Sequence, residues 1–248
     1  MNLITDINFK NKIALIRVDY NVPLNSNLEV SDNTRIKNSL KTINYILNNE
    51  GSCILMSHLG RPKGEGYEKK FSFENITSNI EKEIGKKVTL IKNYINNGNS
   101  IKKKINKGSI TILENLRFYK EEKLCDEKFS KNLASLADVY VNDAFGSSHR
   151  KHASTYSVAQ YFKEKCIGKL IKKELYNIDK ILKSKSKPFT AILGGKKISD
   201  KIDIIKKLIK TVDHIIIGGA ISNTFIKALG GNIGSSLYEN DKINTSII

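Results

Sequence analysis

The chain has 248 residues, of which 40% are hydrophobic, and this is long enough for one large folded domain or two modest ones. Its formal net charge of +17 would suit a nucleic-acid-binding protein, but the lysines are spread over predicted helices and linkers without aromatic platforms, so we expect no nucleic-acid partner. No apolar stretch approaches the roughly 20 residues that span a bilayer, and the N-terminus lacks the pattern of a signal peptide, so we expect no membrane partner and a cytoplasmic location.

Short apolar runs alternate with amphipathic helical patterns along the chain. The runs predict strands at 12–18, 52–56, 88–91, 110–113, 139–141, 189–193 and 214–217. Apolar residues at helical spacing predict helices at 36–47, at 76–84 before a stop at Gly85, and at 129–136. Strands that alternate with helices indicate parallel βα units, so we predict an α/β fold with a doubly wound parallel sheet covered on both faces.

A change of domain is predicted between about residues 166 and 188. Residues 168–182 form a helical pattern, and the segment 183–188 is rich in Lys and Ser and ends in Pro188. A new predicted strand follows at Phe189. We therefore predict a complete N-terminal lobe at 1–166, a connector helix and linker at 167–187, and the start of a second, Rossmann-like lobe at 188–248.

Polar and basic motifs follow the predicted strands at their carboxyl ends, where open parallel sheets bind ligands. This placement predicts one convergent site for an anion, because the planar guanidinium group of arginine holds phosphate and carboxylate through two hydrogen bonds. The residues concerned are Asp19 and Asn21, His58 and Arg61, Arg117, 142–150, 194–201 and 218–219, with Arg35 at the start of a helix.

Gly194 and Gly195 follow the predicted strand at 189–193, and Lys197 and Lys201 lead into a helix. Glycines let a phosphate approach the backbone and a helix start offers N–H groups, so this motif predicts a phosphate cradle. It is neither a Walker A sequence nor a GxGxxG sequence. Gly218 and Gly219 follow the next strand in the same way.

Five motifs, at 17–23, 57–62, 114–118, 142–155 and 194–201, together resemble phosphoglycerate kinase, in the same order along the whole chain. The resemblance implies a glycolytic phosphotransferase with a carboxyl group as acceptor, and a monomer. The implied reaction is reversible transfer of a phosphoryl group between 1,3-bisphosphoglycerate and MgADP, giving 3-phosphoglycerate and MgATP. The first lobe would then bind phosphoglycerate and the second would bind the adenine nucleotide.

The resemblance also assigns roles to individual residues. It implies that Arg35 and Lys197 are catalytic, and that His149 lies between the lobes, where it would help hinge closure. Arg17 is expected to contact the substrate-binding residues and not the substrate itself. Since acyl-phosphate transfer needs little proton chemistry, His58 is assigned to substrate hydrogen bonding, and His152 stays unassigned. The substrate-binding set is Asp19, Tyr20, Asn21, Arg35, His58, Leu59, Gly60, Arg61, Arg117 and Arg150. The nucleotide-binding set is Gly194, Gly195, Lys197, Lys201, Gly218 and Gly219.

Several positions depart from the family pattern. Tyr20 stands where Phe is common, Lys196 replaces a small residue, and Ala220 replaces the third glycine of a run. The sequence stops at Ile248, before the family's ribose-binding acid, its metal-binding Asp and its second glycine-rich loop. We therefore expect no metal ligand in this chain, with the magnesium ligand of the family in the missing C-terminal segment.

The departure at the C-terminus leaves two hypotheses. The first is a phosphoglycerate kinase that needs the missing segment, in which case the chain alone binds phosphoglycerate but does not transfer a phosphoryl group. The alternative is a non-catalytic, phosphoglycerate-binding remnant.

The three cysteines, Cys53, Cys125 and Cys166, have neither disulfide nor zinc-site spacing, and Cys53 is expected to be buried.

Overall fold

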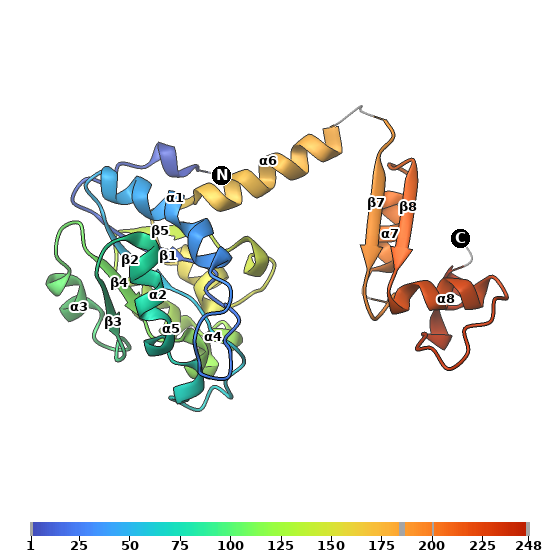
Figure 1. Cartoon of the computed structure of the whole chain (residues 1–248). Coiled ribbons are helices and arrows are strands. Elements are labelled where there is room, and N and C mark those ends of the chain that lie inside the picture. Colours follow the sequence, from blue (N-terminus) through green and yellow to red (C-terminus); the bar gives the residue numbers. More distant parts are fainter. Residues whose placement is uncertain (1, 184–186, 200, 247–248) are drawn as a thin grey trace. The chain divides into compact units, whose positions relative to one another are not determined.

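The computed structural model describes residues 2–183, 187–199 and 201–246, and the chain divides into two compact units (Figure 1). Unit 1 comprises Met1–Ile181 and unit 2 comprises Leu182–Ile248. Linker residues 184–186, which the sequence places between the lobes, and Asp200 in the glycine motif lie outside the described residues. Both units contain parallel strands connected by helices, which confirms the predicted α/β fold.

Unit 1 contains a six-stranded sheet in which every pair is parallel. Its strands are β1 (Ile13–Arg17), β2 (Ser52–Met56), β3 (Val88–Ile91), β4 (Ile110–Leu113), β5 (Val139–Asn142) and β6 (Glu164–Ile167), and their order is β3-β4-β2-β1-β5-β6. The first five confirm strands predicted from apolar runs. The sequence analysis missed the edge strand β6, because Glu164 and Lys165 interrupt its apolar pattern.

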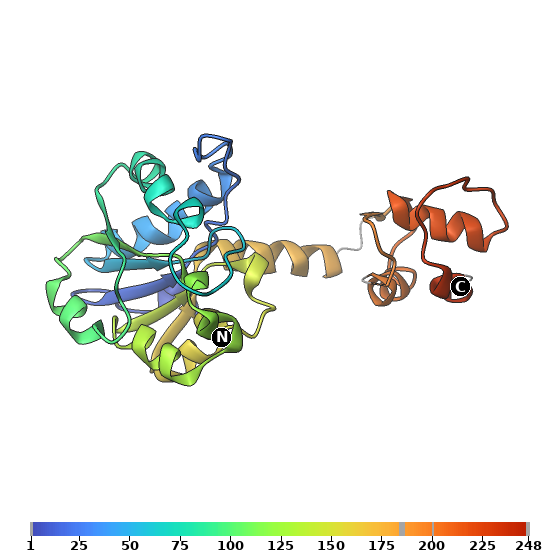
Figure 2. The ribbon, with the colours of Figure 1, turned by 90° about the horizontal axis from the view of Figure 1, so that it is seen from below.

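Helices cover both faces of this sheet (Figure 2). Alternate strand residues define two cores: Ala14 and Ile16 belong to one, and Leu15 belongs to the other. The first core is closed by α1 (Thr34–Asn48) and α2 (Glu74–Ile84), and the second mainly by α5 (Glu127–Ala134). Shorter helices are α3 (Gly98–Lys104) and α4 (Lys120–Leu124). Burial of both faces explains why the central strands are apolar throughout.

The strand order places the loops that carry the polar motifs close together. From β1 the chain moves to β2 on one side, whereas the later strand β5 lies on the other side of β1. This reversal of the strand order is a topological switch point. It leaves a crevice at the carboxyl ends of the central strands, which is where ligands bind in open α/β sheets. The loops after β1, β2, β4 and β5 all begin at this edge.

Helix α6 (Lys169–Lys183) begins directly after β6, and residues from two other elements hold its first turn. The backbone N–H groups of Leu170 and Ile171 donate to Asp143 Oδ1 over 2.9 Å and 3.3 Å, and Lys169 N–H donates to the Thr42 hydroxyl over 2.8 Å. Burial raises the pKa of Asp143 to about 6, against the lowering effect of hydrogen bonds from the Thr42 hydroxyl and the N–H groups of Ile171 and Leu170. Asp143 thus joins the end of β5 to the start of α6.

Unit 2 contains a small parallel sheet of β7 (Thr190–Gly194) and β8 (His214–Gly218), with α7 (Ile202–Leu208) and α8 (Ala220–Ala228). Its core is built around three buried isoleucines, Ile198, Ile205 and Ile221. On the other face of the sheet the paired residues Ile192 and Ile216 are 76% and 54% exposed. In the described residues, therefore, one face of this sheet is covered and the other is open.

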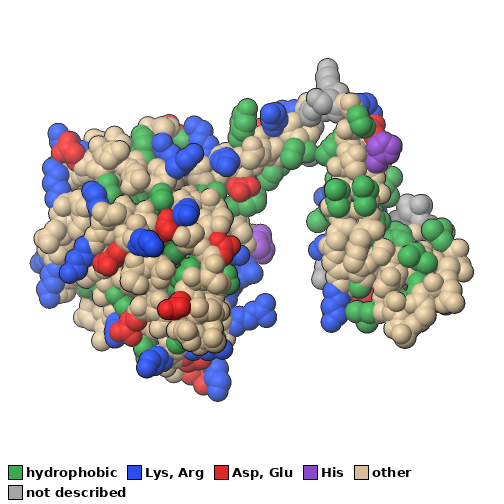
Figure 3. All heavy atoms as spheres, viewed as in Figure 1, with side chains coloured by type: hydrophobic (Ala, Val, Ile, Leu, Met, Phe, Trp, Pro, Cys, Tyr) green, Lys and Arg blue, Asp and Glu red, His purple; other side chains and the backbone are tan. Residues whose placement is uncertain are grey.

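Positive charge is dispersed on the face of unit 1 that Figure 3 draws. On the face drawn in Figure 3, Lys and Arg side chains are scattered among acidic and neutral groups and form no continuous stripe. Among the described residues, no helix has the length and apolar character needed to cross a membrane. Cys53 is fully buried in the first core, as expected.

Candidate functional site

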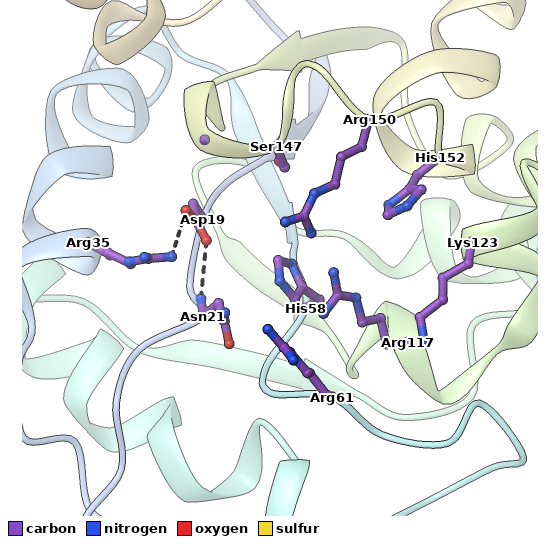
Figure 4. A pocket seen from close by; sticks show the side chains of 11 residues that line it. Asp19, Asn21, Arg35, His58, Arg61, Arg117, Lys123, Ser147, Arg150 and His152 are labelled. Atoms are coloured by element: carbon purple, nitrogen blue, oxygen red, sulfur yellow. Dashed lines mark hydrogen bonds and ion pairs between the residues drawn. The ribbon is translucent and has the colours of Figure 1, made fainter. Parts of the chain in front are cut away.

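A pocket of about 510 Å³ opens at the carboxyl ends of the central strands of unit 1 (Figure 4). We call it the basic pocket. It brings together seven residues that the sequence analysis placed in one site: Asp19, Asn21, Arg35, His58, Arg61, Arg117 and Arg150. Four further lining residues were not in the predicted substrate-binding set: Lys123, Gly146, Ser147 and His152.

The arginines of the chain gather at this pocket. Of the 42 basic Lys and Arg residues, only five are arginines. Four of these arginines line the pocket, and the fifth, Arg17, lies beneath it. Among the described residues, the guanidinium groups of Arg61 and Arg150 have no hydrogen-bond acceptor or carboxylate partner within the protein, whereas Arg117 Nη1 donates to the Gly60 carbonyl over 2.9 Å. Burial, followed by the charges of Arg150 and the other nearby arginines, lowers the pKa of Arg117. Such repulsion between like charges is relieved when an anion binds between them.

The two ends of the basic pocket differ in charge. At one end, which we call the Asp19 end, Asp19 Oδ2 accepts from Arg35 Nη1 over 2.8 Å, and Asn21 Oδ1 accepts from the Gly60 backbone N–H over 2.7 Å. The other end, the cationic end, contains Arg61, Arg117, Lys123 and Arg150 and no carboxylate among the lining residues. In Figure 4 Asp19, Asn21 and Arg35 lie opposite Lys123 and His152. The pocket therefore suits a ligand with an anionic group at one end and hydroxyl or carboxylate groups at the other.

Arg17 and His58 form the floor of the pocket. The Arg17 guanidinium is fully buried, and its Nη2 lies 3.2 Å from His58 Nδ1. Since arginine can only donate, His58 Nδ1 is the acceptor, and the proton of the neutral imidazole is on Nε2. Burial, then the charges of Arg17 and Arg117, lower the pKa of His58 to about 2. His58 is thus a neutral hydrogen-bond donor at neutral pH and not a base that titrates there.

A buried polar network holds Arg17 in place. Its Nε donates to Ser154 Oγ over 2.9 Å, and Ser154 Oγ donates to Glu122 Oε1 over 2.6 Å. The Ser154 backbone N–H donates to the second Glu122 oxygen over 2.9 Å. Glu122 is 1% exposed and is the charge that most opposes the lowering of the Arg17 pKa by burial. The network balances the buried cation and gives the pocket a rigid floor.

The lowered pKa of His58 predicts a specific loss of stability in acid. Because the pKa in the folded state lies below the ordinary value of about 6.5, this contribution is complete above pH 6.5 and is lost as pH falls below it. Between pH 6.5 and 5.5 the wild-type protein should lose about 1 kcal/mol that a His58→Gln variant retains. Urea unfolding of both proteins at the two pH values measures this difference, and parallel losses would show that His58 is not held neutral.

Three predicted substrate-binding residues do not offer a side chain to the pocket. Tyr20 and Leu59 are fully buried, and the Tyr20 hydroxyl pairs with Ser39, so the structure does not support contact of their side chains with a substrate. Gly60 instead shapes the loop: its φ is 64°, and a Cβ there would lie 2.3 Å from the Phe71 ring. His149 is exposed and does not line the pocket.

The glycine motifs of unit 2 meet at the carboxyl ends of β7 and β8. Gly194 and Gly218 are register partners, and a Cβ on Gly219 would lie 3.0 Å from the Gly195 carbonyl oxygen. A Cβ on Gly195 would lie 3.2 Å from Lys201 Cε, so Lys201 reaches this turn, and Lys197 is exposed beside it. The structure thus brings the predicted nucleotide-binding residues together within unit 2.

One part of the predicted phosphate cradle is already engaged. The backbone N–H groups of Ile198 and Ser199 donate to the Glu239 carboxylate, the latter over 3.0 Å, and the Ser199 hydroxyl donates to it over 2.8 Å. These N–H groups precede α7 and were expected to face a phosphate. Glu239 occupies them instead, which leaves the glycines and lysines of the motif as the groups available to an anion. No cluster of three or more potential metal ligands occurs among the described residues.

Comparison with known proteins identifies one family. The phosphoglycerate kinase family model matches residues 4–247. The chain is 46% identical over 244 residues to phosphoglycerate kinase from a Hydrogenobaculum species, covering 98% of this chain and 61% of that protein. It is 45% identical over 239 residues to phosphoglycerate kinase from Aquifex aeolicus, covering 95% of this chain and 59% of that protein.

Solved structures give the same result. The phosphoglycerate kinase structure from Coxiella burnetii matches with a TM-score of 0.84 and 35% identity, over 99% of this chain and 61% of that one. The structure from Pyrococcus horikoshii matches with a TM-score of 0.85 and 27% identity, over 99% of this chain and 64% of that one. The chain therefore spans about 60% of the length of the relatives that it matches.

Proposed function

The chain belongs to the phosphoglycerate kinase family, and from this premise we propose that its basic pocket binds 3-phosphoglycerate or the acyl phosphate 1,3-bisphosphoglycerate. The reaction that this site would serve is reversible transfer of the acyl phosphoryl group to MgADP, which forms 3-phosphoglycerate and MgATP. Unit 1 would hold the three-carbon acid, and the glycine motifs of unit 2 would contact the nucleotide.

The observation that carries this proposal is the placement of the arginines. In a chain whose other basic residues are all lysines, every arginine lines or supports one pocket. Lysine is a compact point charge, whereas arginine offers a planar fork of donors that matches phosphate and carboxylate. The use of arginine at this pocket therefore points to recognition of such a group and not to general surface charge.

The two ends of the pocket give the ligand an orientation. Arg61, Arg117 and Arg150 can surround a phosphate ester, which carries about −1.5 to −2 charge at neutral pH. At the Asp19 end, Asp19 can accept from a ligand hydroxyl, and Arg35, already oriented by Asp19, can donate to a carboxylate or acyl phosphate. His58 Nε2–H adds a neutral donor between the two ends.

This arrangement also fits the chemistry of phosphoryl transfer. Such transfer depends mainly on positioning and on stabilising charge around the moving group, and it needs little proton transfer from the protein. We assign this charge stabilisation to three cations. Arg35 would act beside the three-carbon acid, and Lys197 and Lys201 would act beside the nucleotide. ADP and ATP would use the Gly194–Gly195 and Gly218–Gly219 turns, where the backbone is open to a phosphate. Magnesium would be held by the nucleotide phosphates, and we assign no ligand for it among the described residues.

Calorimetric titration of the chain with 3-phosphoglycerate tests the binding proposal. We expect a single saturable site, weakened by added salt because much of its attraction is between charges. The control is an Arg61→Ala/Arg150→Ala double variant, which should lose this binding while keeping the circular dichroism of the wild type. Equal binding by both proteins would overturn the proposal. A coupled assay of ATP formation from 1,3-bisphosphoglycerate and MgADP separately tests phosphoryl transfer.

A further inference from the structure

Lys123 lies at the cationic end of the basic pocket, although none of the sequence motifs includes it. It is on α4, a helix of five residues that follows the short helical turn Leu116–Phe118, which contains Arg117. The preceding residue, Glu122, points inward and is fixed by Ser154, so the next position on the helix faces the pocket beside Arg117 (Figure 4). Lys120, on the same helix, is exposed and does not line the pocket.

Lys123 is distinguished by its position among the other cations of the basic pocket. Some exposed lysines, such as Lys92, Lys107 and Lys131, pair with a glutamate within 4 Å, whereas Lys120 has no carboxylate partner among the described residues. Among the described residues, the Lys123 ammonium group has no such partner, and the pocket wall nearest to it is formed by Arg117 and His152. A flexible cation that remains beside another cation, without a carboxylate, gains most when an anion enters between them.

We propose that Lys123 is a further ligand of the phosphate group, added at the outer side of the cationic end. This inference rests on the proposed function of the basic pocket and deepens it. Arg61, Arg117 and Arg150 would hold the phosphate by directed hydrogen bonds, and Lys123 would add a mobile charge that closes on the oxygen facing solvent. It would thereby favour the dianionic form of the phosphate over the monoanion.

The test compares Lys123→Gln with Lys120→Gln, because the two changes remove the same charge from the same short helix. Calorimetry with 3-phosphoglycerate at pH 7.5 should show an affinity loss of about threefold to tenfold for Lys123→Gln and no loss for Lys120→Gln. Lys123→Arg should restore the affinity. Glycerate, which lacks the phosphate, should bind equally to all these proteins.

The pH dependence gives a second readout. Because the second phosphate pKa is near 6, the loss caused by Lys123→Gln should shrink at pH 5.5, where the monoanion dominates. An equal effect of both glutamine variants, or an equal loss for glycerate, would overturn the proposal while leaving the basic pocket as the binding site. If the wild-type protein does not bind 3-phosphoglycerate at all, the proposed function itself fails, and this inference fails with it.

Discussion

Replacing Arg17 with Ala is expected to destabilise unit 1 by about 3–5 kcal/mol, because removal of one member of a buried charged network leaves the other uncompensated. Arg17 is 1% exposed, and its loss would leave the buried Glu122 carboxylate without its balancing cation. His58 would also lose the donor that fixes its tautomer. Urea unfolding followed by circular dichroism at pH 7 measures the change.

A paired variant separates charge from packing in this experiment. Arg17→Met combined with Glu122→Gln removes both buried charges while keeping similar side-chain volume, and this should restore much of the stability that Arg17→Ala loses. Loss of less than about 1 kcal/mol in Arg17→Ala would mean that the network does not hold the floor of the pocket. In that case the orientation of His58 would need another cause.

Replacing Arg150 with Ala should weaken binding of 3-phosphoglycerate by about 10-fold to 100-fold, since a hydrogen bond to a charged group contributes about 1.5–3 kcal/mol. Arg150 has no protein acceptor for its guanidinium among the described residues, so its removal breaks no internal contact of that group. Stability should therefore change little while affinity falls. Arg150→Lys should recover only part of the loss, because an ammonium group cannot bind two oxygens in the same fork.

The neighbouring Lys151 provides the matched control. It lies outside the basic pocket and stacks over the Tyr156 ring at 5.1 Å. Lys151→Ala removes the same charge one residue away and should leave the affinity close to that of the wild-type protein. If Lys151→Ala weakens binding as much as Arg150→Ala, long-range charge and not a direct contact would explain the effect.

Much of the fold of unit 1 follows from local sequence signals. The central strands are buried on both faces, so their apolar runs are long and unbroken, and the predicted strand at 52–56 coincides with β2. Gly85, the predicted stop of α2, adopts a left-handed φ of 72°. The arginines could be assigned to one site because each follows a strand at its carboxyl end, or begins the helix after it, and parallel strands bring those ends together.

Other features depend on tertiary contacts that no local pattern encodes. Lys123 faces the pocket because Glu122 is anchored by Ser154, which lies 32 residues away in the chain. The N–H groups expected to form a phosphate cradle are engaged by Glu239, about 40 residues further along the chain. The run at 214–217 suggested burial, but Ile216 is exposed because the described helices cover only one face of its sheet.

The most direct test of the central claim is a crystal structure of the chain with 3-phosphoglycerate. The account predicts that the ligand occupies the basic pocket, with its phosphate within hydrogen-bonding distance of Arg61, Arg117 and Arg150 and its carboxylate toward Arg35 and Asn21. A phosphate bound at the glycine motifs of unit 2 with the basic pocket unliganded, or a ligand in the reverse orientation, would contradict it.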